Sequence, residues 1–241
     1  MEKITEFLAR YYNKSIYFTE QENGFLTSVQ EMIARERLVI RDERNILIPG
    51  CEIYFLNDDS INAFSTIIDD EYYIFVNKGV IDSQKEYLKS LNWCYLSEQR
   101  KDYYIEELIC YGFYFIVFHE YAHILCGHND ACLEDSKDKQ AQEYEADMFA
   151  MDYLINYIFA HCEFAKWTEE IEKMFLAVYF LFNKMRRYHI WAEEYNDRLL
   201  QNYYDPERIE KRDHLLEAQR ILYLFEMLTV IVIDEKINIA D

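Results

Sequence analysis

One short run of residues has the types and the spacing needed for chemistry. His119-Glu120-Tyr121-Ala122-His123 places two imidazoles four positions apart, with a carboxylate directly after the first. On a helix, positions i and i+4 share one face with their Cβ atoms roughly 5–6 Å apart, so both imidazoles can bind one zinc ion. The intervening Glu120 can then take a proton from a bound water and pass it to a leaving amine. The pattern predicts a metal-dependent hydrolase. The simpler interpretation is a pair of histidines packed among aromatic side chains.

A second acidic pattern follows twenty residues after His123. Glu143 and Asp147 stand four positions apart in Glu143-Tyr144-Glu145-Ala146-Asp147. On a helix they share a face with apolar residues such as Ala150, so two carboxylates would lie on a face that otherwise points inward. A buried carboxylate is costly unless it is paired or binds a metal. The alternative is a solvated acidic helix start, which an acidic chain often contains.

The combination of HExxH with ExxxD on a second helix resembles the gluzincins, the thermolysin-like clan of zinc metallopeptidases. The resemblance implies Zn²⁺ as the cofactor, with His119, His123 and Glu143 as ligands and Glu120 as the general base. It also implies that Asp147 accepts the ring N–H of a zinc-binding histidine, His119 in this interpretation, and so fixes its tautomer. Glu145 is an alternative third ligand, although only Glu143 has an aspartate at the fourth following position.

The segment before the motif extends the resemblance. Ile61-Asn62-Ala63-Phe64 and the run from Tyr73 to Val80 are similar to the strand region of HtpX-like and CaaX-protease-like gluzincins. In that clan the Asn-Ala-Phe/Tyr stretch lies at the edge of a sheet and holds extended substrate, which implies that Asn62 and Ala63 bind substrate. On the residues alone, the segment is a strand pair in which Asn62 caps a loop.

A later stretch departs from the pattern of the HtpX-like enzymes. Tyr204–Ile209 is similar to their His-Pro…Arg stretch, which helps to stabilise the oxyanion, but Asp205 stands where the histidine would be. An ionised carboxylate cannot donate a hydrogen bond to an oxyanion. The choice of oxyanion donor stays open among several residues: Arg208, Lys211, Arg212, His189, His214 or a tyrosine.

The run from His119 to His128 is also similar to the ImmA-like and Lit-like soluble bacterial metallopeptidases, which act on intracellular proteins. This resemblance implies a soluble intracellular zinc-dependent endopeptidase whose partner is a protein or peptide substrate. Its main rival is a zinc-holding pseudoenzyme or regulatory protein-binding module. The departure at Asp205 favours that rival, and the presence of Glu120 argues against it. A helical scaffold without a metal is a third alternative.

The composition of the chain limits which partners and which cellular location are expected. The 241 residues carry a formal charge of −20, which argues against nucleic acid and anionic membrane surfaces as partners, because both attract basic proteins. The longest apolar runs, Leu108–Phe118 and Met174–Phe182, are shorter than the roughly 20 residues of a spanning helix. The first residues show no secretory signal, and the six cysteines are scattered without a CxxC pair. These features predict a cytoplasmic protein with reduced thiols and no membrane span; they do not set its oligomeric state.

The elements that must position these residues follow from the hydrophobic periodicity. The fold class expected is α+β and mainly helical: a zincin-like single domain over residues 1–241. In it, a small N-terminal sheet packs on the long HExxH helix and on a second helix that carries the third ligand. The predicted helices cover 2–12, the stretch with Leu26, Val29 and Ile33, Tyr103–Cys126, Gln140–Cys162, Trp167–Asn183 and Asp213–Ile233. The predicted strands are Leu38–Ile40, Asn45–Ile48, Glu52–Leu56, Ile61–Ile68 and Tyr72–Asn77, and Leu133–Lys139 is expected to be a polar connection.

Overall fold

The structure is a computed structural model, and it describes residues 2–17, 24, 27, 31, 34, 50–94, 96–128, 136–194 and 217–234. The chain divides into two compact units, which are described one at a time. The first consists of residues 1–83 and 120–131, and the second of residues 84–119 and 132–241. One division between the units falls inside a continuous helix, α4 (Glu98–Leu125).

The first unit contains a three-stranded sheet. Its strands are β1 (Cys51–Leu56), β2 (Ala63–Ile68) and β3 (Glu71–Asn77), in the order β1-β3-β2. Strand β1 runs parallel to β3, whereas β2 is antiparallel to it. Asp69 and Asp70 form the tight turn between β2 and β3, and both have positive φ, as a two-residue hairpin turn with the strand twist requires. The three predicted strands in this region are therefore confirmed.

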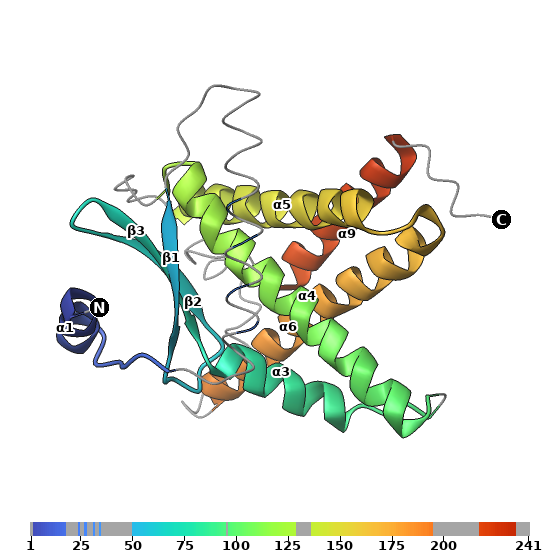
Figure 1. Cartoon of the computed structure of the whole chain (residues 1–241), viewed down its shortest axis with the longest axis horizontal. Coiled ribbons are helices and arrows are strands. Elements are labelled where there is room, and N and C mark those ends of the chain that lie inside the picture. The colour runs from blue at the N-terminus through green and yellow to red at the C-terminus, as the bar shows by residue number, and fades with distance from the viewer. Residues whose placement is uncertain are drawn as a thin grey trace. The chain divides into compact units, whose positions relative to one another are not determined.

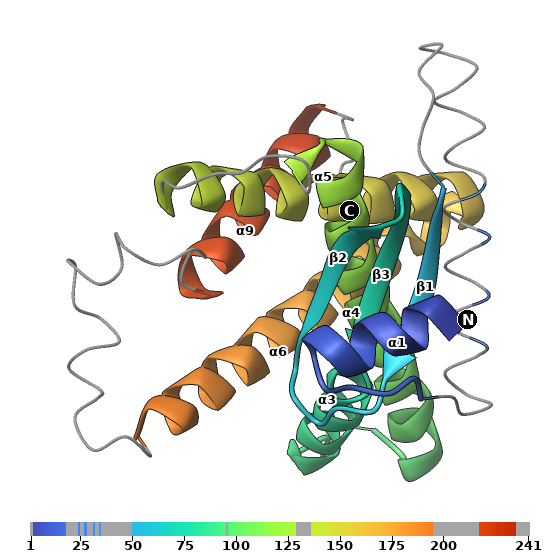
Figure 2. The same cartoon turned by 90° about the vertical axis from the view of Figure 1, so that its left-hand side faces the viewer.

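Helix α1 (Glu2–Tyr11) covers one face of this sheet (Figure 2). Ile4 and Leu8 of the helix form a buried cluster with residues of the strands, including Phe75, and Phe64 of β2 packs against the same cluster. Because side chains alternate along a strand, Ala63, Ser65 and Ile67 of β2 point to the opposite face. The predicted helix over residues 2–12 is confirmed.

The second unit is built from helices. Helix α5 (Ser136–His161), α6 (Trp167–Glu194) and α9 (Glu217–Asp234) contact one another in pairs (Figure 1). A short 3-10 turn, Phe164–Lys166, joins α5 to α6, and α3 (Gly79–Ser90) precedes α4.

The four long helices predicted after residue 100 are confirmed, with α6 extending beyond the predicted end. The expectation that Leu133–Lys139 forms a polar connection is wrong for residues 136–139, which are the first turn of α5. Polar residues suit a first helical turn, and Asp138 there faces the positive end of the helix dipole.

Helix α4 is unusually apolar. Buried side chains follow almost without interruption from Leu108 onward, among them Ile109, Phe113, Phe115, Val117 and Phe118. By length and composition α4 alone among the described helices could cross a membrane, but 78% of its apolar window is buried inside the protein. A helix that is apolar on all sides is expected in a protein core as well as in a membrane.

The architecture agrees with the predicted α+β, mainly helical class, since a small sheet accompanies long helices. The predicted strands Leu38–Ile40 and Asn45–Ile48 fall outside the described residues, as do Leu26, Val29 and Ile33, which carried the prediction of a second helix. The same is true of Tyr204–Ile209.

Candidate metal centre

The HExxH residues lie near the end of α4, as the sequence predicts. His119 is only 7% exposed and Glu120 9% exposed. His123 lies one helical turn further along the same continuous helix, so it shares a face with His119. His119 and Glu120 are buried polar residues on an apolar helix, so their polar atoms need hydrogen-bonding or charged partners. Other elements of the structure supply these partners.

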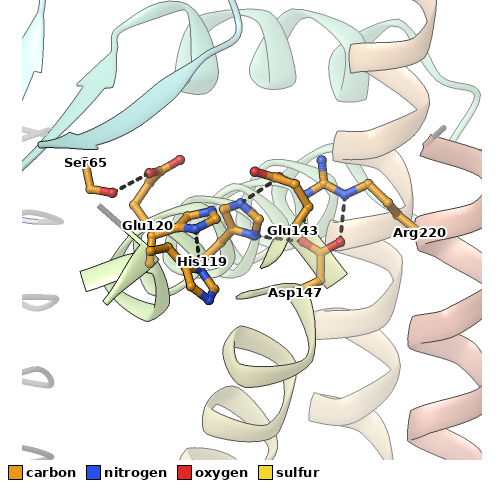
Figure 3. A network of polar contacts seen from close by, with 8 residues as sticks. Ser65, His119, Glu120, Glu143, Asp147 and Arg220 are labelled. Carbon is orange, nitrogen blue, oxygen red and sulfur yellow. Dashed lines mark hydrogen bonds and ion pairs between the residues drawn. The ribbon is translucent and has the colours of Figure 1, made fainter. Parts of the chain in front are cut away.

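Both ring nitrogens of His119 face carboxylates of α5 (Figure 3). Nε2 lies 3.3 Å from Glu143 Oε2, and Nδ1 lies 2.8 Å from Asp147 Oδ1. Glu143 and Asp147 are thus on one face of α5, one turn apart, and both reach the same imidazole. Glu145, between them in sequence, is exposed.

These contacts dominate the electrostatics of His119. Burial disfavours the charged ring, but the contacts with Asp147 and Glu143 outweigh it and raise the pKa of His119 to about 10. A metal ion on the same ring competes with that proton, so metal uptake here would release a proton. The Nε2 side, next to the Glu143 carboxylate, is where such an ion would find two ligands.

Asp147 is held in turn by an arginine from α9 (Figure 3). Arg220 donates from Nε to Asp147 Oδ2 at 2.7 Å and from a terminal nitrogen to Oδ1 at 2.6 Å. Its guanidinium also lies 4.5 Å from the centre of the Phe182 ring. Burial alone would raise the pKa of Asp147, but the charge of Arg220 and the contact with His119 outweigh it and hold that pKa below its usual value.

Sequence reasoning did not find Arg220. The available signal was a charged residue within the apolar pattern of residues 213–233, with Leu216 and Leu224 one helical turn before and after it. An arginine on the apolar face of a helix needs a buried acidic partner. The predicted basic residues Arg208, Lys211 and Arg212 lie outside the described residues, as does His214. No side chain is described for His189.

His123 has a partner that was also missed. Its Nδ1 lies 2.8 Å from Nδ1 of His128, so one ring donates and the other accepts. A metal ion bound to His123 alongside this contact would use Nε2. His128 belongs to the same short run as the motif, but its spacing alone did not indicate a contact with His123.

Glu120 contacts the sheet of the first unit. Ser65 on β2 donates a hydrogen bond from Oγ to Glu120 Oε2, at 3.1 Å (Figure 3). An ionised carboxylate only accepts, so the hydroxyl must be the donor. The predicted general base is therefore tied to a strand 55 residues earlier in the chain.

The donor set suits a catalytic metal. His119, His123 and Glu143 form a group that could hold a metal ion. Two imidazole nitrogens and one carboxylate oxygen are a ligand set typical of catalytic zinc, which keeps a further position for water or substrate. Metal-binding histidines commonly donate their other ring N–H to a carboxylate, and Asp147 lies where it can accept this hydrogen bond from His119.

The residues predicted to bind substrate lie at the start of β2. Among the described strands β2 pairs only with β3, so it stands at an edge of the sheet. Ala63 is its first residue, and Asn62 directly before it is exposed. The carbonyl of Asn62 accepts a hydrogen bond from the backbone N–H of Asn77 at 3.0 Å, which fixes the entry of the chain into the strand.

Comparison with known protein families gives one match. The family model described as Peptidase U49 matches residues 29–194, a span that includes the sheet, the HExxH helix and the helix carrying Glu143 and Asp147. Searches of curated proteins and of solved structures gave no significant match. Because the matched span is well over half of the chain, this protein belongs to the Peptidase U49 family.

Proposed function

We propose that this protein is a soluble, intracellular zinc-dependent endopeptidase of the gluzincin type. Membership of a peptidase family supports hydrolysis of peptide bonds. The observation that carries the zinc assignment is the buried His119, whose two ring nitrogens face Glu143 and Asp147. Two carboxylates around the first histidine are the arrangement expected when ExxxD follows HExxH on a second helix. The whole chain is proposed to act as a single zincin-like domain over residues 1–241.

Each residue has a part in the proposed reaction. A bound zinc ion would supply Lewis-acid activation of water and of the substrate carbonyl. Glu120 takes the proton of the attacking water and then delivers it to the departing nitrogen. His119, His123 and Glu143 would hold the metal, while Asp147 would keep His119 in the tautomer whose Nε2 can bind.

The substrate is proposed to be an extended segment of a protein or peptide. Strand β2 is at a sheet edge of the described structure, and edge strands can pair with an added peptide strand. Asn62 and Ala63 would then hold the substrate backbone. Asn62→Ala should leave zinc content unchanged and lower kcat/KM by roughly 10–100-fold, because orientation of the scissile bond is lost. Unchanged kcat/KM would leave Asn62 as a residue of the loop only.

The proposed location and partners follow from composition. The net charge of −20 disfavours nucleic acid and anionic membranes as partners. The one described helix apolar enough to span a membrane is mostly buried. A cytoplasmic enzyme acting on proteins suits these properties.

The test separates metal binding from catalysis. Glu120→Gln removes the base but no ligand, so the variant should keep its fold and its metal while peptide cleavage falls by about 10²–10⁴-fold or more. Glu106→Gln is the matched control, because Glu106 is an exposed glutamate on the same helix. Cleavage is measured by mapping new protein N-termini in cells that express each form. Near wild-type cleavage by Glu120→Gln would contradict the proposal. A metal-bearing wild type without cleavage products would favour the pseudoenzyme.

A further inference from the structure

Ser65 is a polar residue in an apolar setting. On β2 it lies on the sheet face opposite the cluster that contains Phe64, and its partner on β3 is the fully buried Ile74. Of its two diagonal neighbours on the same face of β3, Val76 is also buried and Tyr72 is half-buried. A serine in such a position weakens packing and has to satisfy its hydroxyl, which suggests a purpose other than stability.

The hydroxyl is used by the proposed general base. Ser65 Oγ lies 3.1 Å from Oε2 of Glu120, and both residues belong to the first unit. Hydrogen bonds to an ionised carboxylate are stronger than those between neutral groups. Since Ser65 occupies Oε2, the carboxylate is held by one oxygen and presents Oε1 for proton transfer.

We propose that Ser65 is a positioning residue that holds the carboxylate of Glu120 in the orientation needed for proton transfer and ties it to strand β2. The inference rests on the proposed function of Glu120. A glutamate on a helix has three rotatable side-chain bonds, and without an anchor its carboxylate samples several orientations. In general acid–base catalysis the base must lie within hydrogen-bond distance of the reacting proton. A carboxylate that samples several orientations meets this condition for only part of the time.

The connection to β2 gives the contact a second consequence. The same strand begins with Ala63, two residues before Ser65, a rise of roughly 7 Å along the strand. If a peptide pairs with this edge, one strand sets the positions of both the substrate backbone and the base. Ser65 therefore fixes the base relative to the place where the scissile bond is proposed to lie.

The kinetic test uses three changes at this pair. Ser65→Ala should lower kcat by about tenfold and leave KM nearly unchanged, because substrate binding is kept and proton transfer is not. Ser65→Thr keeps the hydroxyl and should restore most of kcat. In a Glu120→Gln background, Ser65→Ala should have no further effect, because the group it positions is gone.

A structural readout independent of turnover accompanies the kinetics. A crystal structure of the wild type should show the Glu120 carboxylate in one orientation with Oε2 next to Ser65, and Ser65→Ala should show more than one orientation. Metal content should be equal in both proteins. Thr66→Val is the control, because Thr66 is the next residue on the same strand and points to the other face of the sheet.

The outcomes separate this inference from the proposed function. If Glu120→Gln abolishes cleavage while Ser65→Ala has wild-type kcat and one ordered carboxylate, Ser65 does not position the base and the inference is wrong. If Ser65→Ala loses metal or unfolds, Ser65 is structural and the inference is again wrong. If Glu120→Gln cleaves like the wild type, the failure lies in the proposed function.

Discussion

Two clusters in the second unit each bury a cation among carboxylates. In one, Arg220 joins Asp147 and His119 between helices α9, α5 and α4. In the other, Lys173 of α6 pairs with Glu107 of α4 at 3.1 Å and with Glu169 and Glu170 of its own helix. The cation side chains are almost equally buried, 8% exposed for Arg220 and 7% for Lys173.

The difference lies in what each cluster leads to. The Lys173 cluster consists of carboxylates around an ammonium, with the phenol of Tyr111 donating to Glu170, and its Glu169 side chain is 67% exposed. The Arg220 cluster leads to an imidazole whose other nitrogen faces Glu143. Buried charge alone therefore does not mark a functional site. The first cluster differs because it contains His119, an imidazole that can bind a metal. Asp147 orients this imidazole, and Arg220 in turn fixes Asp147.

The largest expected effect is on stability. Arg220→Met removes the arginine partner of the buried Asp147, and removal of one partner of a buried ion pair typically costs about 3–5 kcal/mol. Lys173→Met should cost about 1 kcal/mol, because part of that cluster is exposed to water. Denaturant unfolding of metal-free protein measures both. Equal losses of unfolding free energy would contradict this prediction, since they would mean that the two clusters contribute equally to stability.

The next effect is on metal affinity, and it should appear in only one cluster. Asp147→Asn weakens the hold on His119 and should lower zinc affinity by roughly 10–100-fold. Glu170→Gln, the same kind of change in the other cluster, should leave zinc affinity unchanged. Competition with a zinc chelator measures both variants. A similar loss in both would show that the effect comes from general loosening of the helices.

The smallest effect is a pH dependence in the Lys173 cluster. Burial alone would raise the pKa of Glu170, but hydrogen bonds from Tyr111 and Lys173 outweigh it and hold the pKa below its usual 4.5. A group whose folded pKa is depressed stabilises the fold above its unfolded pKa, and this stabilisation disappears as pH falls through the folded pKa. The difference in unfolding free energy between wild type and Glu170→Gln should therefore shrink below about pH 4.5. A difference that is constant from pH 7 to pH 3 would contradict the assignment.

The sequence predicted what is local along a helix. The four-residue spacings of His119 with His123 and of Glu143 with Asp147 fix which side chains share a face, because helical geometry is the same everywhere. The strands from 51 to 77 were likewise visible as alternation and turn residues. Their order was not, since the parallel pairing of β1 with β3 depends on the route of the chain between them.

Contacts between distant segments were beyond sequence reasoning. Arg220 is 73 residues from Asp147, and Ser65 is 55 residues from Glu120. Periodicity indicates that a residue faces inward but not which distant residue it meets there. The contact of His123 with His128 lies only five positions apart, yet it depends on how the chain leaves α4, where Gly127 has positive φ.

Elemental analysis of purified protein tests most directly whether His119 and its neighbours hold a catalytic zinc ion. The wild type should contain about one zinc per chain, as a catalytic zinc site requires. His119→Ala should contain almost none, because the ligand that is anchored by Asp147 is lost. His161→Ala is the matched control, since His161 is exposed and contacts its own helix at the Tyr157 carbonyl, and it should keep the zinc. Equal zinc in wild type and His119→Ala, or none in the wild type, would contradict the zinc assignment.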